Sequence, residues 1–512
     1  MTNNQKITLN IVVNLISFAI TIFISLFVTP LIVNTLGGEA YGFVSLAQNF
    51  VGYAALITVA LNSMASRFVS IEIYRQDFKE ASRYFSSVFL SNLLIALVLV
   101  PVFAVIVWKL ELFIEIPAAL VGDVKITFAI TFFQFLLSIL LSHYEIATFV
   151  TNRLYLSQKN TLISSMIRLL LILICFRVFD VRVSYVVAAT LAGHLFGYAM
   201  NVIYTRRYLP ELQVRRKDFS FPYVRRLAAS GVWNLLNKLS GILLDGLDLL
   251  ISNLFIGPVE MGALAISKTV PAMFTSLRGT LDYPFAPPMT QCYAEGDIDG
   301  VIRNARTGNK ILGILMIAPL ATFAIYGQSF FKLWVPEEDS LMIQILSLLS
   351  IMSLIAGACT NSILNIFTIT NRIKIPSIIV LINGILTAVT LLFALKYTSL
   401  GVYAIAGVSS VYGLLRHLLF TPLYGAHCLG VKRSTFYHEI LTGILCLLIN
   451  LGVGLLAFKL CTGDSWLTLI LSAGCMAVVC IAINFFVVLR KPERQALLSA
   501  VLSRLHKNKQ EG

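Results

Sequence analysis

Long apolar blocks alternate with short polar connectors along this chain. Each block is about 20 residues long, and a helix that rises 1.5 Å per residue needs about 20 residues to cross a bilayer core about 30 Å thick. The pattern therefore predicts an all-α, polytopic membrane protein with about fourteen spanning helices. We expect them at residues 11–33, 41–62, 84–108, 126–150, 161–179, 184–205, 227–254, 258–278, 309–331, 341–366, 376–396, 402–426, 440–460 and 466–489.

Composition supports this prediction. The chain is 58% hydrophobic and 12% charged, whereas soluble domains are about 45–50% apolar and about 25% charged. The net charge of +14 comes from basic residues in the connectors, which favours anionic lipid headgroups as partners over nucleic acid. The eight cysteines are scattered without a CxxC pair, so we interpret them as small hydrophobic residues and expect no metal or cofactor.

The distribution of lysine and arginine predicts the topology. With the N-terminus in the cytoplasm, and with residues within two positions of a span end counted on the adjoining side, 28 of the 39 basic residues are cytoplasmic, seven are outside and four lie within spans. Cytoplasmic loops of membrane proteins carry such an excess, so we expect both termini in the cytoplasm and an even number of spans. The first span follows Lys6, has full length and lacks a small-residue cleavage site, so we do not interpret it as a removable signal peptide.

The most basic connector between spans, at 206–226, carries seven lysines and arginines and divides the chain into two six-span halves that look related. A shift of 220 residues superposes three short matches: Gly37–Gly42 on Gly257–Gly262, Leu61-Asn62 on Leu281-Asp282, and Asn14 on Asn234. We predict a first lobe at 1–210, a basic cytoplasmic linker at 211–226 and a second lobe at 227–430. Two additional spans follow at 431–489, and an amphipathic cytoplasmic tail at 490–512. Transporters built from such parallel repeats bind their substrate between the lobes.

No catalytic motif appears in the sequence: there is no P-loop, HExxH or nucleophile elbow. Candidate chemistry lies instead in polar residues within spans, where each is costly and usually faces protein or water. The span at 227–254 carries them at helical spacing, and the first span carries a milder version with Asn14 near its centre. The stripe in 227–254 consists of Asn234, Asn237, Lys238, Gly241, Asp245, Asp248 and Ser252. We favour a central cavity lined by both stripes; the alternative is that Lys238 and Asp245 neutralise each other to hold helices together.

Three further positions are cavity candidates. Lys268 lies near mid-membrane, three residues before Pro271, and Gln48 is its counterpart under the shift of 220. Lys268 either pairs with an acid such as Asp245 or Asp248, or binds an anion. Arg416, in the span at 402–426, is the third candidate.

Other intramembrane charged residues favour structural interpretations. Arg168 and Glu145 lie at similar depths on two consecutive spans, and we expect a structural ion pair rather than a ligand site. Arg278 and Asp282 come at a cytoplasmic helix end, where solvated anchoring is expected. His143 and His194 are expected to pack between helices.

Three stretches of local sequence resemble a known family. They are PLIVNTLGGEAYG at 30–42, SGVWNLLNKLSGILLDGLDLLISNLFIG followed by MGALAISKTVP from Ser230 onward, and PPMTQCYAEGD at 287–297. In this order and spacing they resemble the polysaccharide and O-antigen flippases of the multidrug/oligosaccharidyl-lipid/polysaccharide exporter superfamily. The resemblance covers nearly the whole chain and implies a MATE-like fold.

The resemblance also implies a function. Such proteins move undecaprenyl-diphosphate-linked oligosaccharides across the bacterial cytoplasmic membrane by alternating access, and basic cavity residues receive the diphosphate. Lys238 and Lys268 match that role by type and location. Asp245 and Asp248 are candidates to carry H⁺ or Na⁺ if transport is ion-coupled. A polysaccharide polymerase and glycosyltransferases are the protein partners that this function implies.

Two rival functions remain open. A multidrug or cation exporter of the superfamily commonly has an acid in the first span, and this chain has none before Glu39. A lipid II flippase shares the fold and an anionic cargo, but usually has a basic residue in that span, which is absent here. A glycosyl ligase or polymerase needs large catalytic outer loops, and the longest outer connector, at 109–125, is short, so we reject this class of function.

Overall fold

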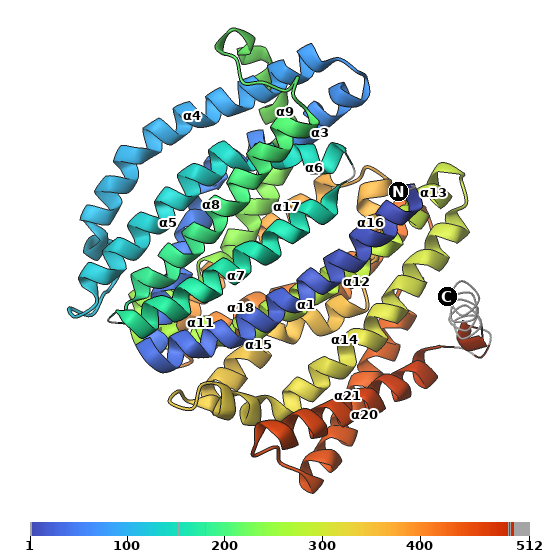
Figure 1. The fold of residues 1–512 in the computed structure, drawn as a ribbon. Coiled ribbons are helices and arrows are strands. Elements are labelled where there is room, and N and C mark those ends of the chain that lie inside the picture. Colours follow the sequence, from blue (N-terminus) through green and yellow to red (C-terminus); the bar gives the residue numbers. More distant parts are fainter. Residues whose placement is uncertain (1–2, 152, 180, 490, 492, 496–512) are drawn as a thin grey trace, which may run out of the picture. The chain divides into compact units, whose positions relative to one another are not determined.

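The computed structural model describes residues 3–151, 153–179, 181–489, 491 and 493–495, and Figure 1 shows its helices. Within these ranges every regular element is a helix, and there is no strand. Eleven helical segments of the described chain are long and apolar enough to cross a membrane. The predicted amphipathic tail at 490–512 lies almost entirely outside the described residues.

The three other predicted spans also fall on helices. The span at 11–33 lies within α1 (Asn3–Leu36), and those at 227–254 and 258–278 are each interrupted. The span predicted at 41–62 is divided between Gly38–Ala54 and Leu56–Tyr74, and only the second of these helices is among the eleven segments. Helix α9 (Phe221–Gly241) has 21 residues but carries Arg225, Arg226 and Lys238, whereas α11 (Pro258–Ser267) and α12 (Thr269–Asp282) are short, with 10 and 14 residues. Neither the span at 227–254 nor that at 258–278 therefore counts among the eleven apolar segments. The structure is compatible with fourteen.

The first of two compact units comprises residues 1–266 and 377–397. Its long helices are joined by short loops, by the 3₁₀ turns η1, η2 and η3, and by one π-helical turn, η4. The elements are α1 (Asn3–Leu36), α2 (Gly38–Ala54), α3 (Leu56–Tyr74), α4 (Phe78–Trp108), η1 (Leu110–Leu112), α5 (Val121–Leu141), η2 (Ser142–Glu145), α6 (Ile146–Val150), α7 (Leu154–Val178), α8 (Val183–Tyr208), η3 (Arg216–Asp218), α9 (Phe221–Gly241), η4 (Ile242–Gly246), α10 (Asp248–Phe255), α11 (Pro258–Ser267) and α17 (Lys374–Tyr397).

The second unit comprises residues 267–376 and 398–512. Its longest helix, α14, packs against α15, α20 and α21, and Figure 1 shows α20 and α21 running beside it. The elements are α12 (Thr269–Asp282), η5 (Tyr283–Phe285), α13 (Ala286–Ala294), α14 (Ile298–Trp334), α15 (Ser340–Ala358), α16 (Ile363–Ile369), α18 (Val402–Leu415), the π-helical turn η6 (Arg416–Phe420), α19 (Thr421–Leu429), α20 (Tyr437–Leu460) and α21 (Trp466–Val488).

These units do not coincide with the lobes predicted from sequence. Helices α9 to α11 cluster with the first unit because α9 packs against α3 and α4, and α10 packs against α2. Helix α17 joins the same unit, where Gly384 lies against Leu243 of η4. The lobe boundaries near residues 210 and 227 stay a prediction.

The internal repeat is visible in the backbone. Gly37 and Gly257, 220 residues apart, both have positive φ and both precede a helix. The same shift relates Gln76 (φ 64°) to Gly296 (φ 77°). The next residue in each repeat, Asp77 or Asp297, caps the following helix: its carboxylate accepts from the backbone N–H three residues on, at 2.9 and 2.8 Å. The two halves therefore share local structure as well as sequence, as two pseudo-symmetric halves require.

The repeated glycine motifs also contact each other. A Cβ built on Gly262 of α11 would lie 2.5 Å from the backbone carbon of Gly38, and one on Gly42 of α2 would lie 3.0 Å from the Cα of Gly262. Only glycine permits this approach, because a Cβ cannot rotate away from backbone atoms. The matching of Gly37–Gly42 with Gly257–Gly262 thus corresponds to a helix contact in the first unit.

Candidate functional site

The polar stripe predicted for residues 227–254 begins on α9. Leu227 and Gly231 are buried on this helix, while Asn237 and Lys238 are exposed and Asn234 is half-buried. The buried part packs on α3, where Gly231 meets the backbone of Ala60. Asn237 and Lys238 are therefore accessible for contact with a ligand, and a substrate-binding role for them stays a prediction.

A π-helical turn interrupts this stripe. In η4 the chain takes one extra residue per turn, and the hydroxyl of Tyr53 donates to the carbonyl oxygen of Gly246 at 2.6 Å. The extra residue changes the helical register, so that Asp245 is exposed whereas Asp248, at the start of α10, is 3% exposed. The prediction that one stripe of 3.6-residue period continues through Asp245 and Asp248 is therefore wrong. Such π turns are frequent at functional sites.

The chain also breaks at Lys268. Helix α11 ends at Ser267 and α12 begins at Thr269. Pro271 has no N–H with which to bond the carbonyl of Ser267, four residues earlier. The hydroxyl of Ser347 lies 2.8 Å from that carbonyl oxygen and 2.8 Å from the carbonyl oxygen of Ile343 in its own helix, so its one proton is shared between the two acceptors. Lys268 is half-buried at the break. Interrupted membrane helices persist only where neighbours satisfy the freed backbone groups, and in transporters they mark binding sites.

The remaining predicted candidates lie in different surroundings. Gln48 is exposed on α2, and the side chain of Asn14 on α1 lies outside the described part of the structure. Arg416 is half-buried in η6, where its Nη2 lies 3.4 Å from Nε2 of His417. Lys268 and Arg416 belong to the second unit and the other candidates to the first, so their assembly into one cavity stays a prediction.

Asp282 is not the solvated anchor that the sequence suggested. It is 9% exposed, and its carboxylate accepts from the hydroxyl of Ser362 at 2.6 Å and from Nδ2 of Asn365 at 3.3 Å. Arg278 lies against Gly357, as does the buried ring of His417. The prediction was wrong because it considered one helix end alone, whereas α16 and the turn before it cover this site.

His143 packs between helices, as expected. Its Nε2 lies 2.7 Å from Nδ2 of Asn92 on α4, and the same Nδ2 donates to Oδ1 of Asn62 on α3 and to the carbonyl oxygen of Ile139 on α5. Three helices therefore share one buried polar contact.

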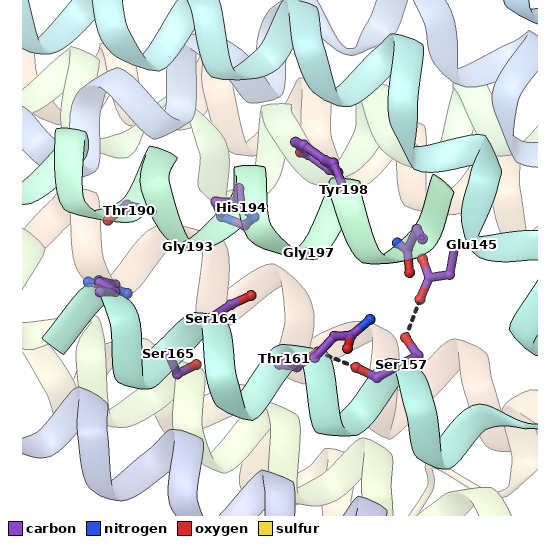
Figure 2. Close-up of a pocket in the computed structure, with 13 residues that line it drawn as sticks. Glu145, Ser157, Thr161, Ser164, Ser165, Thr190, Gly193, His194, Gly197 and Tyr198 are labelled. Atoms are coloured by element: carbon purple, nitrogen blue, oxygen red, sulfur yellow. Dashed lines mark hydrogen bonds between the residues drawn. The ribbon is translucent and has the colours of Figure 1, made fainter. Parts of the chain in front are cut away.

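A polar cavity of about 280 Å³ lies in the first unit, mainly between α7 and α8. Figure 2 shows the polar face of α7 opposite the glycine-containing face of α8, with Ser164 between them. A Cβ on Gly193 would lie 2.7 Å from the carbonyl oxygen of Ser164, so that glycine permits the close approach. The lining consists of Glu145, Ser157, Asn160, Thr161, Ser164, Ser165, Arg168, Thr190, Gly193, His194, Gly197, Tyr198 and Asn201.

Arg168 and Glu145 both line this cavity, but no ion pair joins them among the described residues. The carboxylate of Glu145 accepts from the hydroxyl of Ser157 at 2.8 Å, near the start of α7 (Figure 2). Arg168 lies three helical turns further along, about 16 Å away at 1.5 Å per residue. The expected structural pair is therefore wrong: similar depth on two spans did not bring the side chains together.

Comparisons with known proteins agree with these features. A family model described as "Polysaccharide biosynthesis protein" matches residues 7–279. The uncharacterized membrane protein EpsK of Bacillus subtilis (strain 168) is 31% identical over 502 residues, which cover 96% of this chain and 98% of EpsK.

Two solved structures share the fold. Lipid II flippase MurJ, in an inward closed conformation, matches with a TM-score of 0.66 and 14% identity, over 93% of this chain and 99% of MurJ. A multidrug resistance MATE family transporter of the MOP superfamily, in an inward-facing conformation, matches with a TM-score of 0.59 and 14% identity, over 80% of this chain and 94% of that one. The chain therefore shares the fold of these two membrane proteins and belongs to the polysaccharide biosynthesis protein family.

Proposed function

We propose that this protein is a flippase that moves an undecaprenyl-diphosphate-linked oligosaccharide across the bacterial cytoplasmic membrane for surface polysaccharide synthesis. Membership in the polysaccharide biosynthesis protein family supports the glycan, and the fold shared with a lipid II flippase supports a lipid-linked cargo. Alternating access between the two membrane faces is the mechanism that this fold suggests.

The observation that carries the proposal is the broken helix at Lys268. A lysine at the centre of a membrane helix costs about 2.5–3.5 kcal/mol on insertion scales. Here it lies where Pro271 interrupts the helix and the hydroxyl of Ser347 lies 2.8 Å from the freed carbonyl oxygen. An ammonium group in that position provides a compact cationic partner for a diphosphate, which cannot cross hydrocarbon unaided.

The cargo's other groups find partners on α9. Lys238 and Asn237 are exposed there, so an ammonium and an amide are accessible to phosphate oxygens and sugar hydroxyls. Asp245 is exposed in the π-helical turn, and it is our candidate for H⁺ or Na⁺ coupling.

Surface glycan in a strain that depends on this protein tests the proposal. Lys268→Ala should retain membrane insertion and protein level but stop the appearance of glycan outside, with lipid-linked precursor accumulating. Lys268→Arg should restore export only in part, because a planar guanidinium differs from an ammonium point charge. Lys396→Ala, at an exposed lysine near the end of α17, is the matched control and should behave as wild type.

A structural role for Lys268 has a different signature. In that case Lys268→Ala should reduce the amount of folded protein, and removing Asp245 or Asp248 as well should restore both folding and export. That outcome would contradict diphosphate binding by Lys268. Accumulation of lipid II, rather than of a polysaccharide precursor, would identify the cargo as that of a lipid II flippase.

A further inference from the structure

The cavity between α7 and α8 has the size of a ligand site. Its volume of about 280 Å³ corresponds to about nine waters at about 30 Å³ each. The cavity volume is just below the range of small-molecule sites, which occupy about 300–1,000 Å³. A ligand of one or two rings would fill it.

The residues that line the cavity include hydrogen-bond donors and acceptors along its whole length. Polar side chains recur on α7 at residues 157, 160, 161, 164, 165 and 168, and on α8 at 190, 194, 198 and 201. This spacing places each set on one helix face. Hydroxyl and amide groups that both donate and accept are suited to a polyhydroxylated ring.

Three atoms in the cavity make no hydrogen bond to any described residue: Nδ2 of Asn160, Oδ1 of Asn201 and Nε of Arg168. Asn160 is 5% exposed, so its amide group is buried while one of its two polar atoms is unsatisfied. Its Oδ1 accepts from the hydroxyl of Tyr204 at 3.3 Å. Buried polar groups in native proteins are nearly always satisfied, so these three atoms need a partner that the described residues do not provide.

The charges of the cavity select among polar ligands. Arg168 presents a planar guanidinium that fits a carboxylate through two parallel hydrogen bonds. Glu145 lies at the other end, bonded to Ser157, and disfavours a second anionic group there. An anionic group is therefore favoured only at the Arg168 end, where one carboxylate neutralises the guanidinium. A diphosphate, with more charge, fits this cavity poorly.

We infer that this cavity binds an acidic sugar residue of the transported glycan, with its carboxylate on Arg168 and its hydroxyls on Asn160, Asn201 and the neighbouring serines and threonines. The inference rests on the proposed function and makes this site a determinant of glycan specificity, separate from the lysines assigned to the diphosphate.

Binding of defined sugars to purified protein in detergent tests the inference. The probes are a glucuronate–glucose disaccharide, the neutral glucose disaccharide with the same linkage, and inorganic diphosphate, followed by saturation-transfer NMR and calorimetry. Wild type should bind the acidic disaccharide and prefer it to the neutral one. Arg168→Gln should weaken that binding about tenfold or more, as expected when a charge-assisted pair is lost.

Three variants separate binding from folding. Arg168→Lys retains the charge without the planar fork and should retain part of the preference. Ser165→Leu should occupy the cavity and block binding while Arg168 remains. Arg177→Gln removes an exposed arginine from the same helix and should bind as wild type. Each variant's thermal unfolding is compared with wild type, so that a folding defect is recognised separately.

Several outcomes would overturn the inference. Equal binding of acidic and neutral disaccharides would remove the role of Arg168, and strong competition by diphosphate would make this a headgroup site. If neither disaccharide binds, the cavity between α7 and α8 holds only water. These results leave the proposed function intact if reconstituted protein still translocates a lipid-linked glycan, whereas loss of translocation for every substrate would refute the proposed function itself.

Discussion

The contact between α3 and α9 should not tolerate a side chain at Gly231. A Cβ built on Gly231 would lie 1.8 Å from the carbonyl oxygen of Ala60 and 2.9 Å from its Cα. Heavy-atom contacts of Cβ below 3.0 Å are essentially never seen. The obstructing oxygen belongs to backbone, so no rotamer change relieves it and the two helices must separate by about 1 Å, which forfeits a substantial part of their dispersion energy.

The magnitude follows from two opposing effects. Overpacking costs about 1–3 kcal/mol, occasionally more, and a contact this short belongs at the upper end. Alanine in a helix gains about 1 kcal/mol over glycine. Gly231→Ala should therefore lower the free energy of unfolding by about 2 kcal/mol.

Gly241→Ala provides the matched control. Gly241 is the last residue of the same helix, has helical backbone angles and has open space around its Cβ position. This variant should be about 1 kcal/mol more stable than wild type, so the two variants should differ by about 3 kcal/mol. Unfolding by SDS in mixed micelles, followed by tryptophan fluorescence, measures this difference. Equal stability of the two variants would refute the helix packing described here.

Two other predictions concern polar contacts. Ser347→Ala leaves the carbonyl of Ser267 without its side-chain donor and should cost about 1 kcal/mol in the same unfolding assay; Ser350→Ala, whose hydroxyl bonds only within its own helix, should cost less, and the reverse order would contradict the account of the helix break. A hydrogen bond from Lys125 lowers the pKa of Glu111. Because the folded-state pKa lies below the unfolded value of about 4.3, this pair should stabilise the protein above that pH and lose its effect as pH falls through the folded pKa. Glu111→Gln should therefore lower the melting temperature slightly at pH 7 and progressively less in acid, whereas a constant difference across pH would exclude the pair as its cause.

Most of the membrane-spanning pattern could be predicted from sequence, because the length and hydropathy of a span are properties of that segment alone. The break at Lys268 also had a local cause in Pro271. The π-helical turn at Ile242–Gly246 had no such local cause. The carbonyl oxygen of Gly246 accepts a hydrogen bond from the hydroxyl of Tyr53, which lies on a helix nearly two hundred residues earlier. Asp282 was misjudged for the same reason, since Ser362 and Asn365 reach it from α16 and the turn before it.

The cavity between α7 and α8 had a signal in the sequence. Serine, threonine and asparagine recur along α7 at spacings of three and four residues, and Thr190, His194, Tyr198 and Asn201 follow the same spacing on α8. Such residues often bond their own backbone instead, as Thr161 does with the carbonyl of Ser157 and Thr190 with that of Val186. Only the close approach at Gly193, which depends on both helices together, shows that the two polar faces meet around one space.

Translocation in proteoliposomes tests the central proposal most directly. Purified protein is reconstituted with an undecaprenyl-diphosphate oligosaccharide that carries a fluorophore on its sugar, and an impermeant quencher is added outside. If the protein is a flippase for this cargo, wild type should expose the whole fluorescent pool to the quencher, whereas Lys268→Ala should leave the inner-leaflet half protected as in protein-free vesicles. Protection of that half in wild-type vesicles, with the protein shown to be folded, would contradict the proposal.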